Sequence, residues 1–156
     1  MVEKYYGPIP SQPRPRSAIP KEKPQRGEKR AVFKKVSQVA AFFAGFHIPE
    51  ITHPDLFPLQ NLCTALSAGR SSRFFEKFEK PGKAVEARAE VGYPPFLTMD
   101  PGLLQIYAIA SPAISLDILE KEVWEEVEKL RQEPLPAEEL TKVKKQARAY
   151  FLQAQE

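Results

Sequence analysis

Apolar and polar residues change their spacing several times along the chain, and each change predicts a different element. Residues 29–36 (KRAVFKKV) alternate well enough for a strand, and residues 38–48 (QVAAFFAGFHI) form an apolar run that predicts a second one. Another pair of strands is predicted over residues 84–93, where small apolar residues alternate with charged ones, and over residues 102–111. The strand at 84–93 is expected to have one face in water.

Two segments between these strand pairs have apolar residues at helical spacing and predict helices. The first is expected to start at Asp55 and to end at Gly69, because glycine readily adopts the left-handed conformation that ends a helix. The second covers residues 71–80, with Ser71 or Ser72 as its N-cap and three phenylalanines as its buried stripe.

Two more helices are predicted after the second strand pair. One has Ser115 as its N-cap and a buried apolar stripe, with Trp124 packed beside that stripe. The other opens near Pro136 and reaches Glu156 without a terminating signal, so the chain is expected to stop inside an element. Two strands, two helices, two strands and two helices predict an α+β domain, with an antiparallel sheet that has helices packed on one face.

Composition supports one such domain behind an arm. A chain of 156 residues, 42% of them hydrophobic, can bury one core. Residues 1–27 contain six prolines and are predicted to be an extended linker, which leaves residues 28–156 as the folded domain. No stretch has the length of a membrane span and no signal peptide is visible, so cytoplasm and periplasm both fit. Cys63, the single cysteine, lies in an apolar helical run and is expected to be buried.

Charge is unevenly distributed along the chain. Residues 1–36 hold ten Lys or Arg against three acids, whereas the remainder holds thirteen against seventeen. A basic arm is one way to bind nucleic acid. This arm lacks interleaved aromatic residues for stacking on bases, and no recognition motif follows it, so we interpret it as a solvated linker.

The chain's only two histidines, in H47-I-P-E-I-T-H53, raise the question of a zinc site. Zinc helices of the H-E-x-x-H or H-x-x-E-H type place two histidines four residues apart on one face. His47 and His53 are six residues apart, and Pro49 interrupts a helix between them. Because catalytic zinc also needs a third ligand, the stretch is predicted to be a loop that holds no metal.

Several pieces of the sequence, taken in order, resemble the second half-domain of the pitrilysin and insulinase family of zinc peptidases, which includes mitochondrial processing peptidase. The resemblance covers about residues 5–156. It implies the LuxS-like and processing-peptidase-like metallohydrolase fold, here ending before the family's final helices. The matching pieces are the YYGPIP arm, the FFAGFHIPE strand, a helix from His53-Pro54-Asp55 through Gly69 to Ser71-Ser72-Arg73, and Glu138-Glu139-Leu140 followed by Lys142 or Lys144.

The resemblance also implies that the two halves of such a peptidase have different roles. Family members pair an H-x-x-E-H half with a half that lacks this motif, and the two enclose a peptide that lies along a sheet edge while zinc and a glutamate base attack it. This chain contains no H-x-x-E-H. It is therefore expected to hold no cofactor and to be inactive alone, with the zinc in a catalytic half that lies upstream or on another subunit. Bare apolar surface predicts that the isolated chain forms a homo-oligomer.

Some second halves of this family contact substrate through an arginine and a tyrosine. Their positions fall on Glu79 and Val85 here, and neither residue matches. Arg88 and Lys83 are candidates to contact substrate in place of this pair. The alternative is that both are charged side chains that point into solvent from the strand.

Ser72 and Arg73 are further candidate substrate-binding residues, because a helix start offers free backbone donors to a carboxylate or carbonyl. The interpretation we favour is structural, with Ser72 as a helix cap and Arg73 as a link between helices or halves. Two functions remain open at this point. The chain is either the peptide-enclosing half of a zinc peptidase or a catalytically inactive, peptidase-like scaffold or peptide-binding subunit.

Overall fold

The chain forms two units, Met1–Lys35 and Val36–Glu156. The computed structural model describes residues 2–8, 10, 23–92 and 100–153. In the first unit, α1 (Val2–Tyr6) is a single exposed helical turn, and residues 23–35 form neither helix nor strand. The arm was predicted to be extended over residues 1–27, and α1 departs from that prediction at its start. Residues 1, 9 and 11–22 of the arm lie outside the described residues.

The strand predicted over residues 29–36 is absent, and this prediction was wrong. All eight residues are exposed, and the Phe33 side chain is 89% exposed. An alternating pattern forms a stable strand only where a neighbouring strand pairs with its backbone and one face is buried. Neither condition is met here, so the pattern produces no strand.

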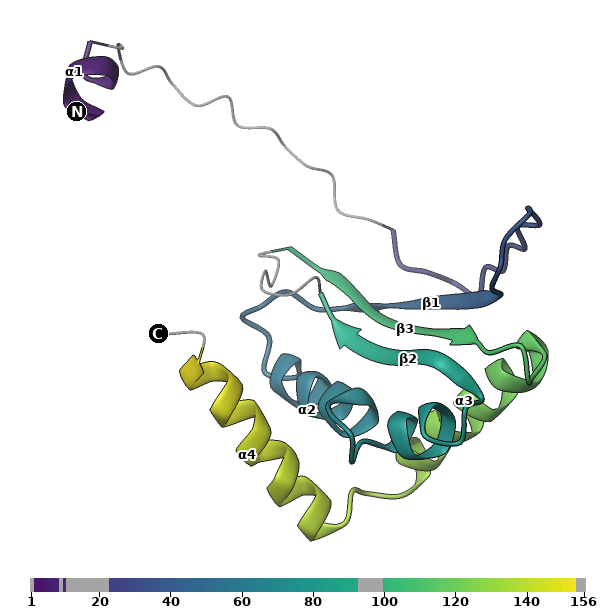
Figure 1. The fold of residues 1–156 in the computed structure, drawn as a ribbon. Helices are drawn as coiled ribbons and strands as arrows, with labels where there is room; N and C mark the ends of the chain where they lie inside the picture. Colours follow the sequence, from purple (N-terminus) through teal and green to yellow (C-terminus); the bar gives the residue numbers. More distant parts are fainter. Residues whose placement is uncertain (1, 9, 11–22, 93–99, 154–156) are drawn as a thin grey trace. The chain divides into compact units, whose positions relative to one another are not determined.

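The other three predicted strands form one antiparallel sheet in the order β1-β3-β2 (Figure 1). They are β1 (Ala41–Ile48), β2 (Ala84–Val91) and β3 (Gly102–Ala110). His47 and Ile48 are the last residues of β1, so the predicted loop begins only at Pro49. A register shift near Ala84 marks a bulge at the start of β2.

Helices cover one face of this sheet, as predicted (Figure 1). They are α2 (Leu56–Ser67), the π-helical turn η1 (Phe75–Glu79), α3 (Leu116–Gln132) and α4 (Ala137–Gln153). Helix α2 and η1 pack on β2, α3 packs on β3 and β1, and α4 packs on α2. The architecture is α+β, and none of the helices among the described residues is long and apolar enough to cross a bilayer.

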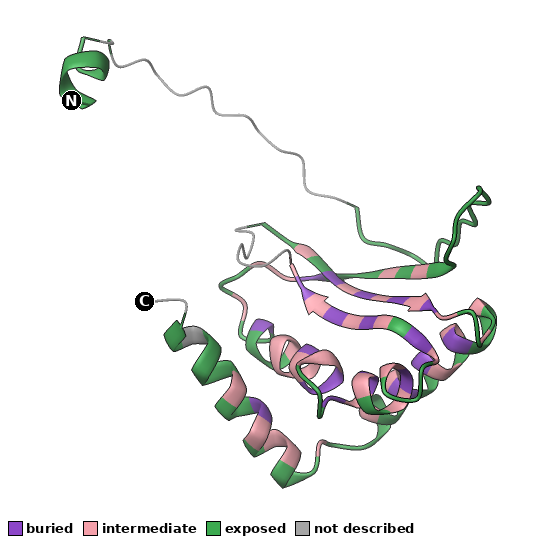
Figure 2. Cartoon of the chain, in the orientation of Figure 1, coloured by how far each residue is buried: buried purple, intermediate pink, exposed green. Residues whose placement is uncertain are grey.

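Alternation along β2 and β3 explains why the helices lie on one face. Buried and half-buried positions alternate along both strands, most plainly on β2 (Figure 2). The buried positions of the two strands are mainly small or aliphatic residues, such as Ala87, Ala89, Ile106 and Ala108, so the helices approach the sheet closely. The alternate, half-buried positions form what we call the open face; they carry mainly polar residues, and Ile109 is an apolar exception.

The core lies between this sheet and the helices. Phe74 and Phe78 are fully buried, with ring centroids 5.6 Å apart. Trp124 packs against the rings of Phe42 and Phe46 at 6.1 and 5.9 Å, which confirms the predicted packing role. Cys63 is buried as predicted, and burial, with a smaller effect of Glu90, raises the pKa of its thiol to about 12.

Two of the predicted helix ends are confirmed by the structure, and the predicted role of Ser72 as a helix cap is not. Gly69 has φ +78° after α2, and the Ser115 hydroxyl accepts a hydrogen bond from the Ile118 amide at 3.4 Å. Ser72 does not cap the next turn through its side chain. Its hydroxyl donates to the Gly69 carbonyl at 2.7 Å, because the tight turn after Gly69 brings that acceptor closer than the helix amides.

Candidate functional site on the open face of the sheet

One row of side chains crosses the open face from edge to edge. Arg88 on β2 pairs in register with Tyr107 on β3, and Tyr107 pairs with Phe43 on β1. The Phe43 side chain is 62% exposed, and Arg88 and Tyr107 are half-buried. The row therefore brings an arginine, a phenol and an aromatic ring into line across the three strands.

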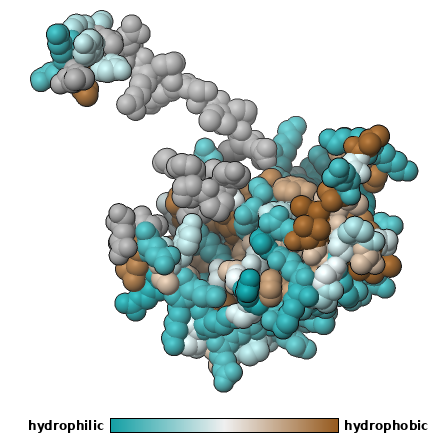
Figure 3. All heavy atoms as spheres, in the orientation of Figure 1, coloured by the Kyte–Doolittle hydropathy of each residue, from teal (hydrophilic) through white to brown (hydrophobic). Residues whose placement is uncertain are grey.

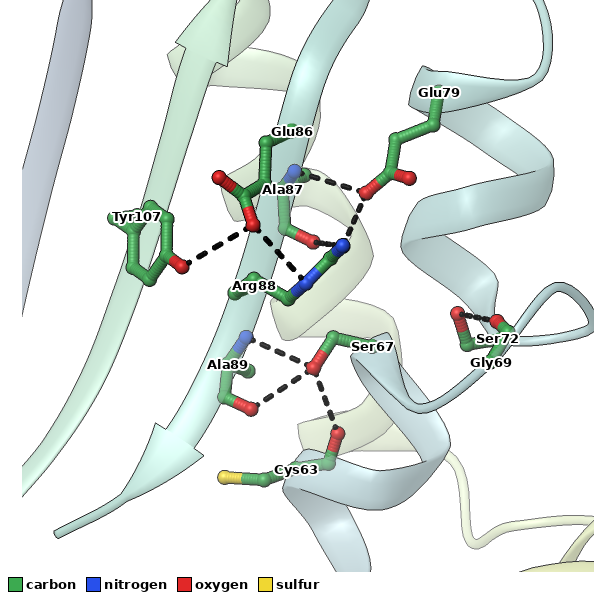
Figure 4. Close-up of polar contacts among 10 residues, drawn as sticks. All are labelled: Cys63, Ser67, Gly69, Ser72, Glu79, Glu86, Ala87, Arg88, Ala89 and Tyr107. Atoms are coloured by element: carbon green, nitrogen blue, oxygen red, sulfur yellow. Dashed lines mark hydrogen bonds and ion pairs between the residues drawn. The ribbon is translucent and has the colours of Figure 1, made fainter. Parts of the chain in front are cut away.

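Arg88 is held at the edge of β2 by two carboxylates (Figure 4). Its Nη1 donates to Glu79 Oε1 and, at 2.9 Å, to the Ala87 carbonyl, and its Nε lies 3.5 Å from Glu86 Oε1. The Arg88 side chain is 36% exposed, so part of the guanidinium still faces solvent. These contacts fix the direction of the arginine without enclosing it.

Tyr107 shares the Glu86 carboxylate with Arg88. Its hydroxyl donates to Glu86 Oε1 at 3.5 Å, the limit of a hydrogen bond (Figure 4). Burial and the nearby charges of Glu86 and Glu90 raise the pKa of Tyr107, so the phenol is a neutral donor at physiological pH. Tyr107 was not identified from the sequence, because residues 102–111 are mostly apolar and its side of the strand also carries Leu103 and Ile109.

Glu79 and Val85, the two positions where the family's arginine and tyrosine were expected, have different roles here. Glu79 closes η1, and its Oε1 accepts from the Ala87 amide at 3.0 Å as well as from Arg88. Val85 lies at the bulge of β2 and is exposed. The structure thus supplies an arginine beside the Glu79 position, but from the neighbouring strand.

Lys83, the other candidate for substrate contact, is engaged elsewhere. Its Nζ donates to both carboxylate oxygens of Glu122 on α3, at 2.8 and 2.6 Å. The lysine thereby ties the start of β2 to α3.

Ser72 and Arg73 were predicted both as substrate contacts and as structural links. Ser72 is 3% exposed, and its hydroxyl is used by the Gly69 carbonyl. Arg73 binds Glu139 of α4 in a bidentate pair, with Nε–Oε1 at 2.8 Å and Nη2–Oε2 at 2.7 Å, and its Nη1 reaches Glu126 of α3 at 3.2 Å. Their predicted substrate contacts stay predictions, while the contacts that Arg73 makes join the start of the η1 turn to α3 and α4.

The Arg73 contacts belong to a larger arrangement that we call the clamp, formed by Arg73, Lys77, Glu126 and Glu139. Lys77 Nζ donates to Glu126 Oε2 at 2.8 Å. Burial disfavours the charge on Glu126, yet Lys77, Lys129 and Arg73 outweigh it and lower the pKa of this carboxyl. Hydrogen bonding to Arg73 likewise lowers the pKa of Glu139, so both acids are ionised within the clamp.

Neither histidine is part of a metal centre among the residues described. His53 Nδ1 accepts from the Asp55 amide at 3.2 Å, which stabilises the turn before α2. Within the described ranges, no group of three or more His, Cys, Asp or Glu side chains is arranged to hold a metal ion. The residues present therefore do not fit a catalytic zinc.

Comparison with known proteins identifies the family of this chain. The chain matches the family described as the Peptidase M16 inactive domain over residues 1–147, and it belongs to that family. A non-catalytic half of an M16 protease is thus the class that this sheet and its helices define. Comparison with curated proteins gave no match.

Eight chains of solved structures match this chain, and one is a protease from Helicobacter pylori. The two are 25% identical, with a TM-score of 0.68 over 77% of this chain. The match covers 28% of the Helicobacter chain, so the present chain corresponds to only part of that protein.

Proposed function

We propose that this domain helps to enclose a peptide substrate in a zinc metallopeptidase of the pitrilysin and insulinase type. The zinc and its H-x-x-E-H motif lie on another domain or chain, which is the principal partner. The row formed by Arg88, Tyr107 and Phe43 carries this proposal, because it presents charge, a hydrogen-bond donor and an aromatic surface across all three strands. An extended peptide displays carbonyls, carboxylates and apolar side chains that these groups recognise.

Substrate contact falls on Arg88 rather than on Ser72 or Arg73. The donors of Arg73 that are directed at Glu139 and Glu126 already have close partners, and Ser72 is buried. Arg88 faces solvent in part, and a peptide carboxylate or carbonyl competes with Glu86 for its Nε at little cost, since that pair is 3.5 Å apart.

A second function, a peptidase-like scaffold without a part in hydrolysis, is supported by Glu79 and Val85. These residues replace the arginine and tyrosine that the family resemblance calls for, and Glu79 reverses the charge. Both functions place a peptide or partner chain on this domain. They differ in whether removal of Arg88 slows hydrolysis.

The experiment has two parts. Binding of fluorescein-labelled casein, an unstructured polypeptide, is measured by anisotropy for the full chain, for Arg88→Ala and for Arg131→Ala, a control at an arginine whose side chain is 78% exposed on α3. Arg88→Ala is expected to weaken binding by about tenfold, since a charge-assisted hydrogen bond contributes on the order of 1.5–3 kcal/mol in full and less when part-exposed. The control is expected to bind normally.

The chain is then mixed with a purified half-domain that carries H-x-x-E-H, and casein hydrolysis is followed. A rate that rises on addition of the chain and falls with Arg88→Ala supports the enclosing role. Complex formation with a rate that is indifferent to Arg88→Ala selects the scaffold. Absence of both casein binding and complex formation refutes the proposal.

A further inference from the structure

Side chains cover the outer edge of β2 in place of a neighbouring strand (Figure 4). The Ala87 amide donates to Glu79 Oε1 at 3.0 Å, and the Ala87 carbonyl accepts from Arg88 Nη1 at 2.9 Å. The Ser67 hydroxyl accepts from the Ala89 amide at 3.0 Å and donates to the Ala89 carbonyl at 2.9 Å. Ser67, Glu79 and Arg88, which we call the edge cover, thus bond the backbone groups with which a further strand would pair.

The edge cover is held in place by the packing of the helices. Ser67 is the last residue of α2 and Glu79 is the last residue of η1, and both of these elements pack on β2. Arg88 comes from β2 itself and is bound by Glu79. The Glu79 side chain is only 14% exposed, so water competes weakly for its carboxylate. The cover is therefore part of the fold, and it opens only if these side chains are displaced or removed.

The strand beneath the cover is self-complementary. Residues 85–91 read V-E-A-R-A-E-V, the same in both directions. If β2 of a second copy pairs antiparallel with Ala89 opposite Ala89, each Arg88 lies opposite Glu90 of the other copy. The outward positions 87, 89 and 91 then face one another across the contact, which gives about six backbone hydrogen bonds.

Two neighbouring registers are less favourable. With Arg88 opposite Arg88, like charges face each other on the open face, and Glu86 likewise faces Glu90. With Ala87 opposite Ala87, the bulge near Ala84 falls inside the contact and interrupts the pairing. The register with Ala89 opposite Ala89 avoids both problems.

We propose that the edge cover keeps β2 from pairing with β2 of a second copy, which is the partner that the uncovered edge fits. Backbone hydrogen bonds and two Arg88–Glu90 ion pairs hold the copies together once the cover is removed. Apolar contact adds little, because the side of the domain drawn in Figure 3 is mostly hydrophilic, with smaller apolar areas in brown. The contact is isologous, so one uncovered edge on each copy is enough to join the two sheets.

Sedimentation equilibrium compares the full chain with an uncovered variant, Ser67→Ala combined with Glu79→Ala. The variant is expected to self-associate at least about tenfold more tightly, because the Ala87 and Ala89 groups become free to pair. Arg73→Ala is the control, since it is expected to weaken the fold through the clamp while the edge cover stays intact, and it should not change association. Circular dichroism checks that each variant folds. If the double variant does not fold, Ser67→Ala alone replaces it and is expected to shift association in the same direction.

Charge reversal tests the register. Glu90→Lys in the uncovered variant places a lysine opposite Arg88 and is expected to weaken the association at least about tenfold. Further addition of Arg88→Glu puts opposite charges across the contact again and should restore the association. Glu125→Lys is the matched control, because it makes the same charge change at an exposed residue of α3, and it should have no effect.

Equal association of the wild type and the uncovered variant overturns the proposal. A rise in association that Arg73→Ala reproduces also overturns it, since lost stability would then explain the rise. Association that Glu90→Lys weakens no more than Glu125→Lys overturns the pairing through β2. The inference does not depend on the proposed function, because its readouts need neither peptide nor zinc.

Discussion

Replacement of Arg73 by alanine tests whether the clamp holds the helices together. The variant loses the bidentate pair with Glu139, at 2.8 and 2.7 Å, and the contact with Glu126 at 3.2 Å. Arg73 and Glu139 are largely shielded from water, with side chains 24% and 23% exposed, and Glu126 is more shielded still. Lys77 remains on Glu126, so that buried carboxylate keeps one close cation.

The expected loss follows from these contacts. Hydrogen bonds to charged groups contribute about 1.5–3 kcal/mol each at most, and partial exposure reduces the sum. We therefore expect Arg73→Ala to lower the free energy of unfolding by about 2–3 kcal/mol, since Glu139 and Glu126 both lose a partner. A double-mutant cycle of Arg73→Ala with Glu139→Ala should give a coupling energy of about 1–2 kcal/mol.

Urea unfolding followed by circular dichroism at neutral pH measures both quantities. Arg131→Ala is the control, because Arg131 pairs only with Glu128 three residues away on an exposed helix face, and its loss should be close to undetectable. A loss below about 0.5 kcal/mol for Arg73→Ala, or additive effects in the cycle, would refute the structural role assigned to the clamp.

Three further predictions concern the same domain. The pKa values of Glu126 and Glu139 in the folded protein lie below the ordinary 4.5, so these carboxylates stabilise the fold above that pH and stop doing so as pH falls through the lowered values. In thermal melts, the melting temperature of Glu139→Gln should therefore fall less steeply with acid than that of the wild type. Cys63 should react with a thiol dye only after unfolding, and rapid labelling of native protein would contradict its burial. Ser67→Ala should lower the free energy of unfolding, measured in urea, by about 1–2 kcal/mol, because the Ala89 amide and carbonyl both lose the Ser67 hydroxyl. An unchanged urea midpoint would show that water replaces these hydrogen bonds.

Sequence pattern predicted most of the sheet and its covering helices. Residues 85–91 alternate strictly between small apolar and charged residues, and this pattern alone identifies a strand with one wet face. Residues 29–36 show a similar but weaker alternation and form no strand. Alternation shows only that one face of a strand could be buried, and burial also requires a neighbouring strand or helix. The neighbours of a strand are set by the tertiary fold.

The row of Arg88, Tyr107 and Phe43 was only partly predictable for the same reason. Arg88 was a candidate on charge and position. Its neighbours in the row are distant in sequence, Tyr107 lying 19 residues after it and Phe43 lying 45 residues before it, and only the strand register joins them to Arg88. From the sequence, Glu79 was noted only because it stands where the family resemblance expects an arginine. Its contacts with Ala87 and Arg88 could not be predicted, because they depend on how η1 packs at the edge of β2. Spacing in sequence predicts faces of elements, and it does not predict which faces meet.

The motifs that carry the family resemblance turn out to contact one another. Arg73, from the S-S-R segment, binds Glu139 of the E-E-L segment, and Lys142 Nζ donates to the Ser71 carbonyl at 2.8 Å. This part of the signature therefore describes how α4 packs beside the end of α2, and a domain needs that packing whether or not it assists hydrolysis. Resemblance through these residues accounts for the fold of an inactive half. Under the proposed function, contact with a peptide depends on residues outside the clamp, and Arg88 is the one to remove first.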